Sequence, residues 1–484
     1  MAGWVKSLWK DSLVYGIGYG VSRFLQIIIL PIITQALTLS EFGYYSNYVI
    51  FYTFCAGFFV LGLDNSVARF FYDTEDKNYH QQIFSTSFFF ILLVSTLSVS
   101  GFAFFSPQFV HILGVPQQYG NTFLYVLLCI PAVSVNNFFL SWFKWKRQKF
   151  YFLINSGGTI VLLLVPLLLA KNVSFIYIFR VLFWSQLIIA ILSTFFAREY
   201  IRFYFNKKLM RSLLAYGFPW LLVFLFGLSR TYLDRVFLTK YLRDDVYGMY
   251  NFSVRVSTLI SLVITAFEMS FGPLAFSIWN KEGANQFFAR LQSMYVFFIS
   301  VVACAICIAS PFIIQILGGT KYEGSEKILP LLLFAAIPVS LINFSNLGTV
   351  YAKKSFLSTL SLFIGFTAVL VLNLFITHVY LQYGAALSSM IGHILIIVSG
   401  YVFSKKYYKI PFSYGKDAFV YLFFFIVSLI TVNYNLSQNN YLNLLYQSVI
   451  LVVLIIVFLL FIFPDEIRKT LSAVRGMLYR GQSL

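Results

Sequence analysis

Five arginines lie inside long apolar stretches of the sequence, where a charge is costly unless it faces water or a partner. Two of them, at positions 23 and 230, each follow a serine. A guanidinium keeps its proton and binds phosphate oxygens through two parallel hydrogen bonds. We therefore regard all five as candidate ligands for a pyrophosphate or an acidic sugar: Arg23, Arg180, Arg230, Arg235 and Arg255.

Uncharged polar residues share the helical faces of two of these arginines. An α-helix turns by about 100° per residue, so residues three, four and seven apart lie on one side. Such polar stripes on apolar helices predict the wall of a water-filled pathway, and hydrogen bonding between helices is the alternative. The residues concerned are Tyr19 and Gln26, beside Arg23, and Asn251 and Thr258, beside Arg255.

Acidic residues are scarcer in the apolar stretches, and three are candidates for binding a coupling proton or sodium ion. Asp64 ends one apolar stretch and Glu268 lies near the end of another. Asp234 follows Arg230 at the i,i+4 spacing that favours an ion pair. For Asp234 the structural role of an arginine partner is therefore the stronger interpretation.

The apolar stretches that must position these residues dominate the chain. Of 484 residues, 60% are apolar and only 11% are charged, against about 25% charged in soluble domains. About 20 apolar residues span the hydrocarbon core of a bilayer. The sequence predicts an all-α membrane protein of about fourteen helices, at 12–36, 43–64, 83–105, 119–143, 152–170, 174–197, 212–238, 247–270, 291–314, 328–351, 355–377, 382–404, 416–434 and 442–463.

The net charge of +18 follows the predicted topology. If both termini are cytoplasmic, the cytoplasmic segments hold 25 of the 35 Lys and Arg residues and the outer loops hold five. This bias satisfies the positive-inside rule and indicates cytoplasmic termini. The basic excess therefore predicts orientation and attraction to membrane lipids, and no nucleic-acid partner is expected.

An internal repeat divides the chain. SPQFVHILG at 106–114 returns as SPFIIQILG at 310–318, and FGYYSNY at 42–48 returns as YGMYNFS at 247–253. Each repeat would hold six helices, so the two lobes would be parallel and would enclose a central site near the midplane, as in several transporters. We predict a six-helix lobe at 1–205, a second at 206–410, and an additional two-helix segment with a cytoplasmic tail at 411–484.

Other motifs carry no chemistry on this interpretation. Cys304-x-x-Cys307 lies within an apolar stretch without a second pair, so we expect packing rather than a metal. No Walker motif is present, and the outer loops are short and lack clustered acids or arginines. We expect a protein that is not an enzyme and that needs no cofactor or metal.

Two segments near the start of the chain carry a family pattern: LPIITQALTLSEFGYYS at 30–46 and LGLDNSVARFFYD at 61–73. The matching positions are Glu41, Gly43, Tyr44, Gly62, Leu63, Ala68, Arg69 and Phe70. Through them the chain resembles, over nearly its whole length, the Wzx-type O-antigen and capsule repeat-unit flippases, the polysaccharide branch of the multidrug/oligosaccharidyl-lipid/polysaccharide exporter superfamily.

This resemblance implies a flippase of the bacterial inner membrane. It would move undecaprenyl-pyrophosphate-linked oligosaccharide to the outer leaflet by alternating access, and its arginines would meet the pyrophosphate. A polysaccharide polymerase and a chain-length regulator are possible partners. A peptidoglycan-precursor flippase and a multidrug or small-solute exporter of the same fold are the alternatives, and the sugar cannot be inherited from the family.

Overall fold

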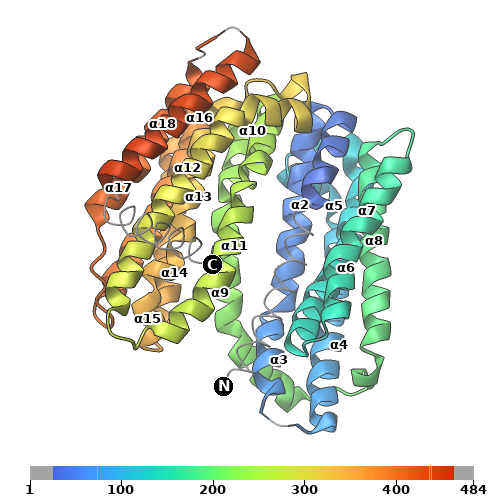
Figure 1. Cartoon of the computed structure of the whole chain (residues 1–484). Coiled ribbons are helices and arrows are strands. Elements are labelled where there is room, and N and C mark those ends of the chain that lie inside the picture. The colour runs from blue at the N-terminus through green and yellow to red at the C-terminus, as the bar shows by residue number, and fades with distance from the viewer. Residues whose placement is uncertain (1–24, 74, 435, 438, 463–484) are drawn as a thin grey trace, which may run out of the picture.

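The computed structural model describes residues 25–73, 75–434, 436–437 and 439–462, and every regular element within these ranges is a helix (Figure 1). One set of helices follows the segment Leu25–Ala36. It comprises α2 (Leu39–Val60), α3 (Leu63–Phe71), α4 (Lys77–Phe104), α5 (Ser106–Ile112), α6 (Gly120–Trp145), α7 (Lys149–Leu169) and α8 (Phe175–Phe196).

The second set begins after the long helix α9 (Lys207–Tyr241). It comprises α10 (Asp244–Ser257), α11 (Ile260–Ile278), α12 (Ala284–Gly318), α13 (Leu329–Ser340), α14 (Ile342–Ser345), α15 (Leu347–Tyr351) and α16 (Ser355–Ser404), followed by α17 (Tyr414–Asn433) and α18 (Asn440–Ile462). Figure 1 shows the two sets as two lobes, with α9 between them.

The described membrane-spanning helices account for thirteen of the fourteen predicted ones. Within the described residues, twelve helical stretches are long and apolar enough to cross a bilayer. One of them, α16, contains Leu381 with φ 50° and ψ −129°, so it joins the two helices predicted at 355–377 and 382–404. The predicted helix at 12–36 lies largely outside the described residues. The chain is a multi-pass membrane protein, and the residue boundaries predicted for its two repeats stay a prediction.

One predicted helix, at 247–270, is broken into α10 and α11. At the break, the hydroxyl of Ser257 donates to the carbonyl of Val254 at 2.8 Å, and that of Thr258 donates to the carbonyl of Arg255 at 2.6 Å. Hydroxyls that bond back to the preceding turn compete with the helical ladder and bend helices. The helix predicted at 247–270 thus lies within one helical stretch, Asp244–Ile278, which has a tightened turn at Thr258 that the sequence analysis did not predict.

The lobes meet at one end of the molecule along α2 and α10, a contact that we call the α2–α10 seam. Gly43 and Gly248 face each other across it, and a Cβ atom added at Gly248 would lie 1.8 Å from the carbonyl oxygen of Leu39. No side chain fits in that space. Two glycines thus let the two helix backbones approach closely.

Side-chain hydrogen bonds close the same seam. The hydroxyl of Tyr44 on α2 donates to the carboxylate of Asp244 on α10, and the hydroxyl of Tyr247 on α10 donates to the amide oxygen of Asn47 on α2. Each bond joins residues 200 positions apart in the sequence. The seam therefore combines close backbone packing with specific polar contacts from both lobes.

A second contact, the α3–α9 seam, lies at the opposite end. The hydroxyl of Ser66 on α3 donates to the carbonyl of Leu213 on α9 at 2.7 Å. A Cβ atom at Gly217 would lie 2.8 Å from that hydroxyl and 2.9 Å from the carbonyl oxygen of Leu61. The start of α9 packs on α3 while α9 also packs extensively on α16. This helix thus connects the two lobes (Figure 1).

Candidate functional site

A polar cavity of about 290 Å³ lies between the lobes, and we call it the Arg255 chamber. The first lobe contributes residues from the Leu25–Ala36 segment and from α2, α7 and α8, and the second lobe contributes residues from α10 and α11 and the break between them. Its polar lining consists of Gln26, Tyr45, Tyr52, Ser156, Thr159, Gln186, Arg255, Thr258 and Ser261.

Arg255 is the charged group of this chamber. Its side chain is half-buried, and among the described residues no carboxylate lies within ion-pair distance of it. A guanidinium between membrane helices that lacks a protein counter-charge is expensive unless water or an anion solvates it. The chamber therefore has the electrostatics of an anion site.

The helix break described above lies at the chamber wall. Arg255 is in the last turn of α10, Thr258 is at the break, and Ser261 follows at the start of α11; all three line the chamber. The backbone amides of Thr258, Leu259 and Ser261 are hydrogen-bonded within this tightened turn. The chamber wall here therefore offers the side chains of Arg255, Thr258 and Ser261 rather than free backbone groups.

A second cavity of about 590 Å³, the Asp64 chamber, lies beside the α3–α9 seam. Its polar groups come from α3 and α6, with Thr265 from α11, and its opposite wall is formed by α9. The polar and charged lining residues are Asp64, Asn65, Asn137, Ser141, Lys144 and Thr265, and the aromatic ones are Phe152, Trp220 and Phe224.

The two chambers follow each other along the same two helices. On α2, Tyr52 lines the Arg255 chamber and Gly57 lines the Asp64 chamber; on α11, Ser261 and Thr265 do the same. Five residues of α-helix advance by about 7.5 Å along the axis. The two chambers therefore lie next to each other along α2 and α11, between the lobes.

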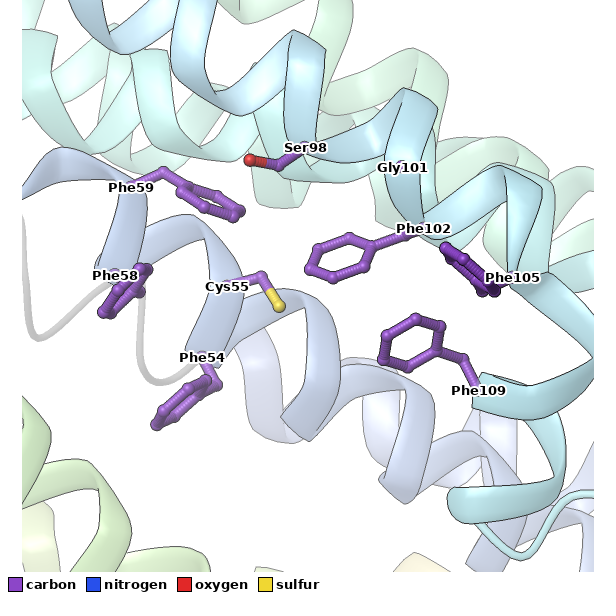
Figure 2. A pocket seen from close by; sticks show the side chains of 9 residues that line it. All are labelled: Phe54, Cys55, Phe58, Phe59, Ser98, Gly101, Phe102, Phe105 and Phe109. Atoms are coloured by element: carbon purple, nitrogen blue, oxygen red, sulfur yellow. The ribbon is translucent and has the colours of Figure 1, made fainter.

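A third cavity, of about 510 Å³, is apolar. Figure 2 shows the rings of α2, among them Phe54 and Phe58, on one side and Phe102 of α4 and Phe109 of α5 on the other. No charged side chain lines it. Its chemistry suits hydrocarbon chains and does not suit a charged or hydroxyl-rich headgroup.

Of the predicted site residues, the structure brings Gln26, Arg255 and Thr258 together in the Arg255 chamber. Arg180 on α8 is exposed, with its guanidinium 5.7 Å from the ring centre of Tyr125, and does not line either chamber. Arg23 and Tyr19 lie outside the described residues. Arg230 lies in α9, and its side chain is also outside the description.

Two further predicted residues serve contacts elsewhere. Asn251 is buried, and its amide donates to the carbonyl of Tyr247 on its own helix at 2.9 Å. Its stripe with Arg255 therefore does not extend to the chamber wall. Glu268 accepts a hydrogen bond from Asn343 at 3.4 Å and lines neither chamber.

Asp234 lies in a buried polar pair with its neighbour. The side chains of Asp234 and Arg235 are 5% and 7% exposed, and the hydroxyl of Tyr250 donates to one carboxylate oxygen at 2.5 Å. The other carboxylate oxygen and the Nε of Arg235 have no hydrogen-bond partner among the described residues. This second carboxylate oxygen can therefore accept a proton or bind a cation.

Several lining residues were missed by the sequence analysis. Gln186 accepts a hydrogen bond from Asn136 at 2.9 Å and lines the Arg255 chamber. Asn137 and Trp220 line the Asp64 chamber. Gln186 and Asn137 could have been recognised from the sequence, because each carries a side-chain amide within an apolar stretch. Trp220 could not have been recognised in this way, because tryptophan is common in membrane helices.

Within the described part of the chain, no three His, Cys, Asp or Glu side chains gather closely enough to hold a metal ion. Cys304 and Cys307 are free and buried on α12.

Comparison with known families gives one match, to a family described as polysaccharide biosynthesis protein, over residues 8–279. An uncharacterized membrane protein of Methanocaldococcus jannaschii is 24% identical over 218 residues, which are 44% of this chain and 42% of that protein. The alignment thus spans less than half of this relative.

Solved structures share the fold over most of the chain. The lipid II flippase MurJ in an inward closed conformation superposes with a TM-score of 0.76 at 15% identity, covering 94% of this chain and 100% of that one. An inward-facing multidrug resistance transporter of the MATE family, in the MOP superfamily, gives 0.59 at 12% identity, covering 82% and 94%. At these identities the likeness concerns the fold alone.

Proposed function

The chain belongs to the polysaccharide biosynthesis protein family, and from this premise we propose that it is a flippase for a lipid-linked oligosaccharide. The substrate is an undecaprenyl-pyrophosphate-linked repeat unit of a surface polysaccharide such as O-antigen or capsule. The protein moves it from the cytoplasmic to the outer leaflet of the bacterial inner membrane. It acts as a carrier and not as an enzyme.

The observation that carries this proposal is Arg255, which lies in a polar chamber between the lobes and has no carboxylate partner among the residues that the structure describes. A pyrophosphate supplies the missing negative charge and accepts the two parallel hydrogen bonds that a guanidinium donates. The hydroxyls and amides of the chamber suit the remaining phosphate oxygens. Arg23 and Arg230 stay predicted contributors to the same headgroup site.

The two seams supply the moving parts. Lys144, near the end of α6, lines the Asp64 chamber beside the α3–α9 seam, and Lys146 and Lys149 follow it, so the positive-inside rule favours a cytoplasmic location for that end. The α2–α10 seam then closes the outer side. Opening one seam while the other is closed gives alternating access to the chambers. A polysaccharide polymerase and a chain-length regulator are the partners expected on the outer side.

A lipid-linked peptidoglycan precursor is the second candidate substrate, favoured by the extent of the likeness to the lipid II flippase. A cationic drug is a weaker candidate, because the central charge of the Arg255 chamber is positive. Both alternatives are separated from the first by deleting the gene in its native host and identifying the lipid-linked intermediate that accumulates.

Arg255→Ala should lower export of the lipid-linked oligosaccharide about tenfold or more, since a hydrogen bond to a charged group contributes about 1.5–3 kcal/mol. Arg255→Lys should retain part of the activity, because lysine keeps the positive charge but cannot donate the two parallel hydrogen bonds of a guanidinium. Complementation of the deletion strain measures both. Lys171→Ala, an exposed cation between α7 and α8, is the matched control; equal export by all three variants would refute the role of Arg255.

Asp234 is the strongest of the three acids for ion coupling, because one buried oxygen of its carboxylate has no hydrogen-bond partner in the part of the chain that the structure describes. Asp234→Asn preserves the size of the side chain and removes its charge. We expect it to abolish gradient-driven accumulation in proteoliposomes while substrate binding in detergent persists. Accumulation at the wild-type level would assign Asp234 to structure alone, as the sequence favoured.

A further inference from the structure

The Asp64 chamber contains polar groups whose hydrogen-bonding capacity is unused. Asn137 is exposed to the cavity in the second half of α6, and its amide has no hydrogen-bond partner among the described residues. An unsatisfied amide within a membrane helix costs free energy unless water or a ligand bonds to it. Asp64 and Ser141 extend the same wall.

The charge of this chamber differs from that of its neighbour. Asp64 places a carboxylate in its wall, with the amide of Asn65 donating to that carboxylate at 3.2 Å. Lys144 lies at the basic end of the same chamber. A carboxylate repels a pyrophosphate, whereas it accepts hydrogen bonds from hydroxyl groups. The wall therefore suits a neutral, hydroxyl-rich group.

The opposite wall is aromatic. Trp220 on α9 is 45% exposed and lines the chamber together with Phe224. The face of an indole ring carries partial negative charge, and the axial C–H bonds of a pyranose carry partial positive charge, so the two surfaces stack. An aromatic platform facing amides and a carboxylate is the arrangement that recognises a sugar ring from its apolar face and its hydroxyl edge at once.

We propose that the Asp64 chamber is a sugar subsite, in which Trp220 stacks on one ring of the oligosaccharide and Asn137 and Asp64 bond its hydroxyls. This inference rests on the proposed function, because the sugar arrives attached to the pyrophosphate held by Arg255. The neighbouring positions of the two chambers along α2 and α11 fit such a substrate, with the pyrophosphate in one and the adjoining sugar in the other.

The experiment compares two lipids on the purified full-length protein in nanodiscs. One is the lipid-linked oligosaccharide extracted from the native host that lacks the gene, and the other is undecaprenyl pyrophosphate without sugar. We expect the wild-type protein to bind the glycosylated lipid about tenfold more tightly or better, since each hydrogen bond or stacking contact contributes on the order of 1 kcal/mol.

Variants of the lining residues test whether the preference for the glycosylated lipid arises in the Asp64 chamber. Trp220→Ala and Asn137→Ala should each remove most of the preference while leaving binding of undecaprenyl pyrophosphate unchanged, and Trp220→Phe should restore part of it. Trp184→Ala is the matched control, because Trp184 is similarly exposed at 53% on α8 and lines neither chamber.

Each outcome separates the two proposals. If the wild-type protein binds both lipids equally, or if Trp220→Ala and Asn137→Ala keep the wild-type preference, the sugar subsite is refuted and the pyrophosphate site stands. If Arg255→Ala leaves the binding of both lipids intact, the pyrophosphate site is refuted instead.

Discussion

A Gly248→Val protein should lose transport and rest with its chambers open to the outer side. The added Cβ atom would lie 1.8 Å from the carbonyl oxygen of Leu39, which is backbone and cannot rotate away. Overpacking of an interior costs about 1–3 kcal/mol and sometimes more, and only the state with a closed α2–α10 seam bears this cost. The equilibrium should therefore shift away from that state by about tenfold or more.

Accessibility of a cysteine in the chamber measures this shift. Ser261→Cys places a thiol in the Arg255 chamber, in a background in which the four native cysteines are replaced. Gly248→Val should raise its reaction with an impermeant reagent added outside. Gly272→Val on α11 is the control, since a Cβ atom there would meet nothing within 4 Å. Unchanged labelling with normal transport would show that this seam does not gate the chamber.

A Gly217→Val protein should rest with its chambers open to the cytoplasm, the opposite of Gly248→Val. Its Cβ atom would lie 2.8 Å from the hydroxyl of Ser66 and 2.9 Å from the carbonyl oxygen of Leu61, so the α3–α9 seam cannot close as it is. The hydrogen bond from Ser66 to Leu213 would be lost with it. States that are open to the cytoplasm should be favoured, and transport should again fail.

Inside-out vesicles test this second variant with the same thiol. Reaction of Ser261→Cys from the cytoplasmic face should rise in Gly217→Val and stay at its wild-type value in Gly227→Val, where a Cβ atom on the same helix meets nothing within 4 Å. If Gly217→Val instead raised labelling from the outside, the assignment of the two seams to opposite faces would be reversed.

The helices were predictable because the bilayer imposes their length and composition. An apolar stretch of sufficient length has few alternatives in a membrane. The boundary between 355–377 and 382–404 was predicted where Leu381 departs from helical geometry. The break at Thr258 was not predicted, because it depends on hydroxyl-to-carbonyl bonds that hydropathy does not record.

The site residues that could be predicted from the sequence are those whose burial in a membrane costs the most free energy. Arg255 and Gln26 are conspicuous in the sequence because they are polar residues of membrane helices, and both line the Arg255 chamber. Asn251 is equally conspicuous, yet it is satisfied by its own helix. Sequence shows that a polar group lies in a membrane helix, but its partner depends on packing between distant segments. For the same reason, the sequence predicted Asp64 but not the chamber around it, since Asn137 on α6 and Trp220 on α9 are brought together only by packing between distant segments.

The two motifs from which the repeat is predicted, FGYYSNY and YGMYNFS, lie on the two helices that pack against each other at the α2–α10 seam. Gly43 and Gly248 occupy the same motif position and lie in contact. Equivalent positions meeting across an interface is the signature of an isologous homodimer. The seam thus has the form of a dimer contact within one polypeptide, and the predicted repeat would let the chamber residues of the two halves differ while this shared contact keeps the halves paired.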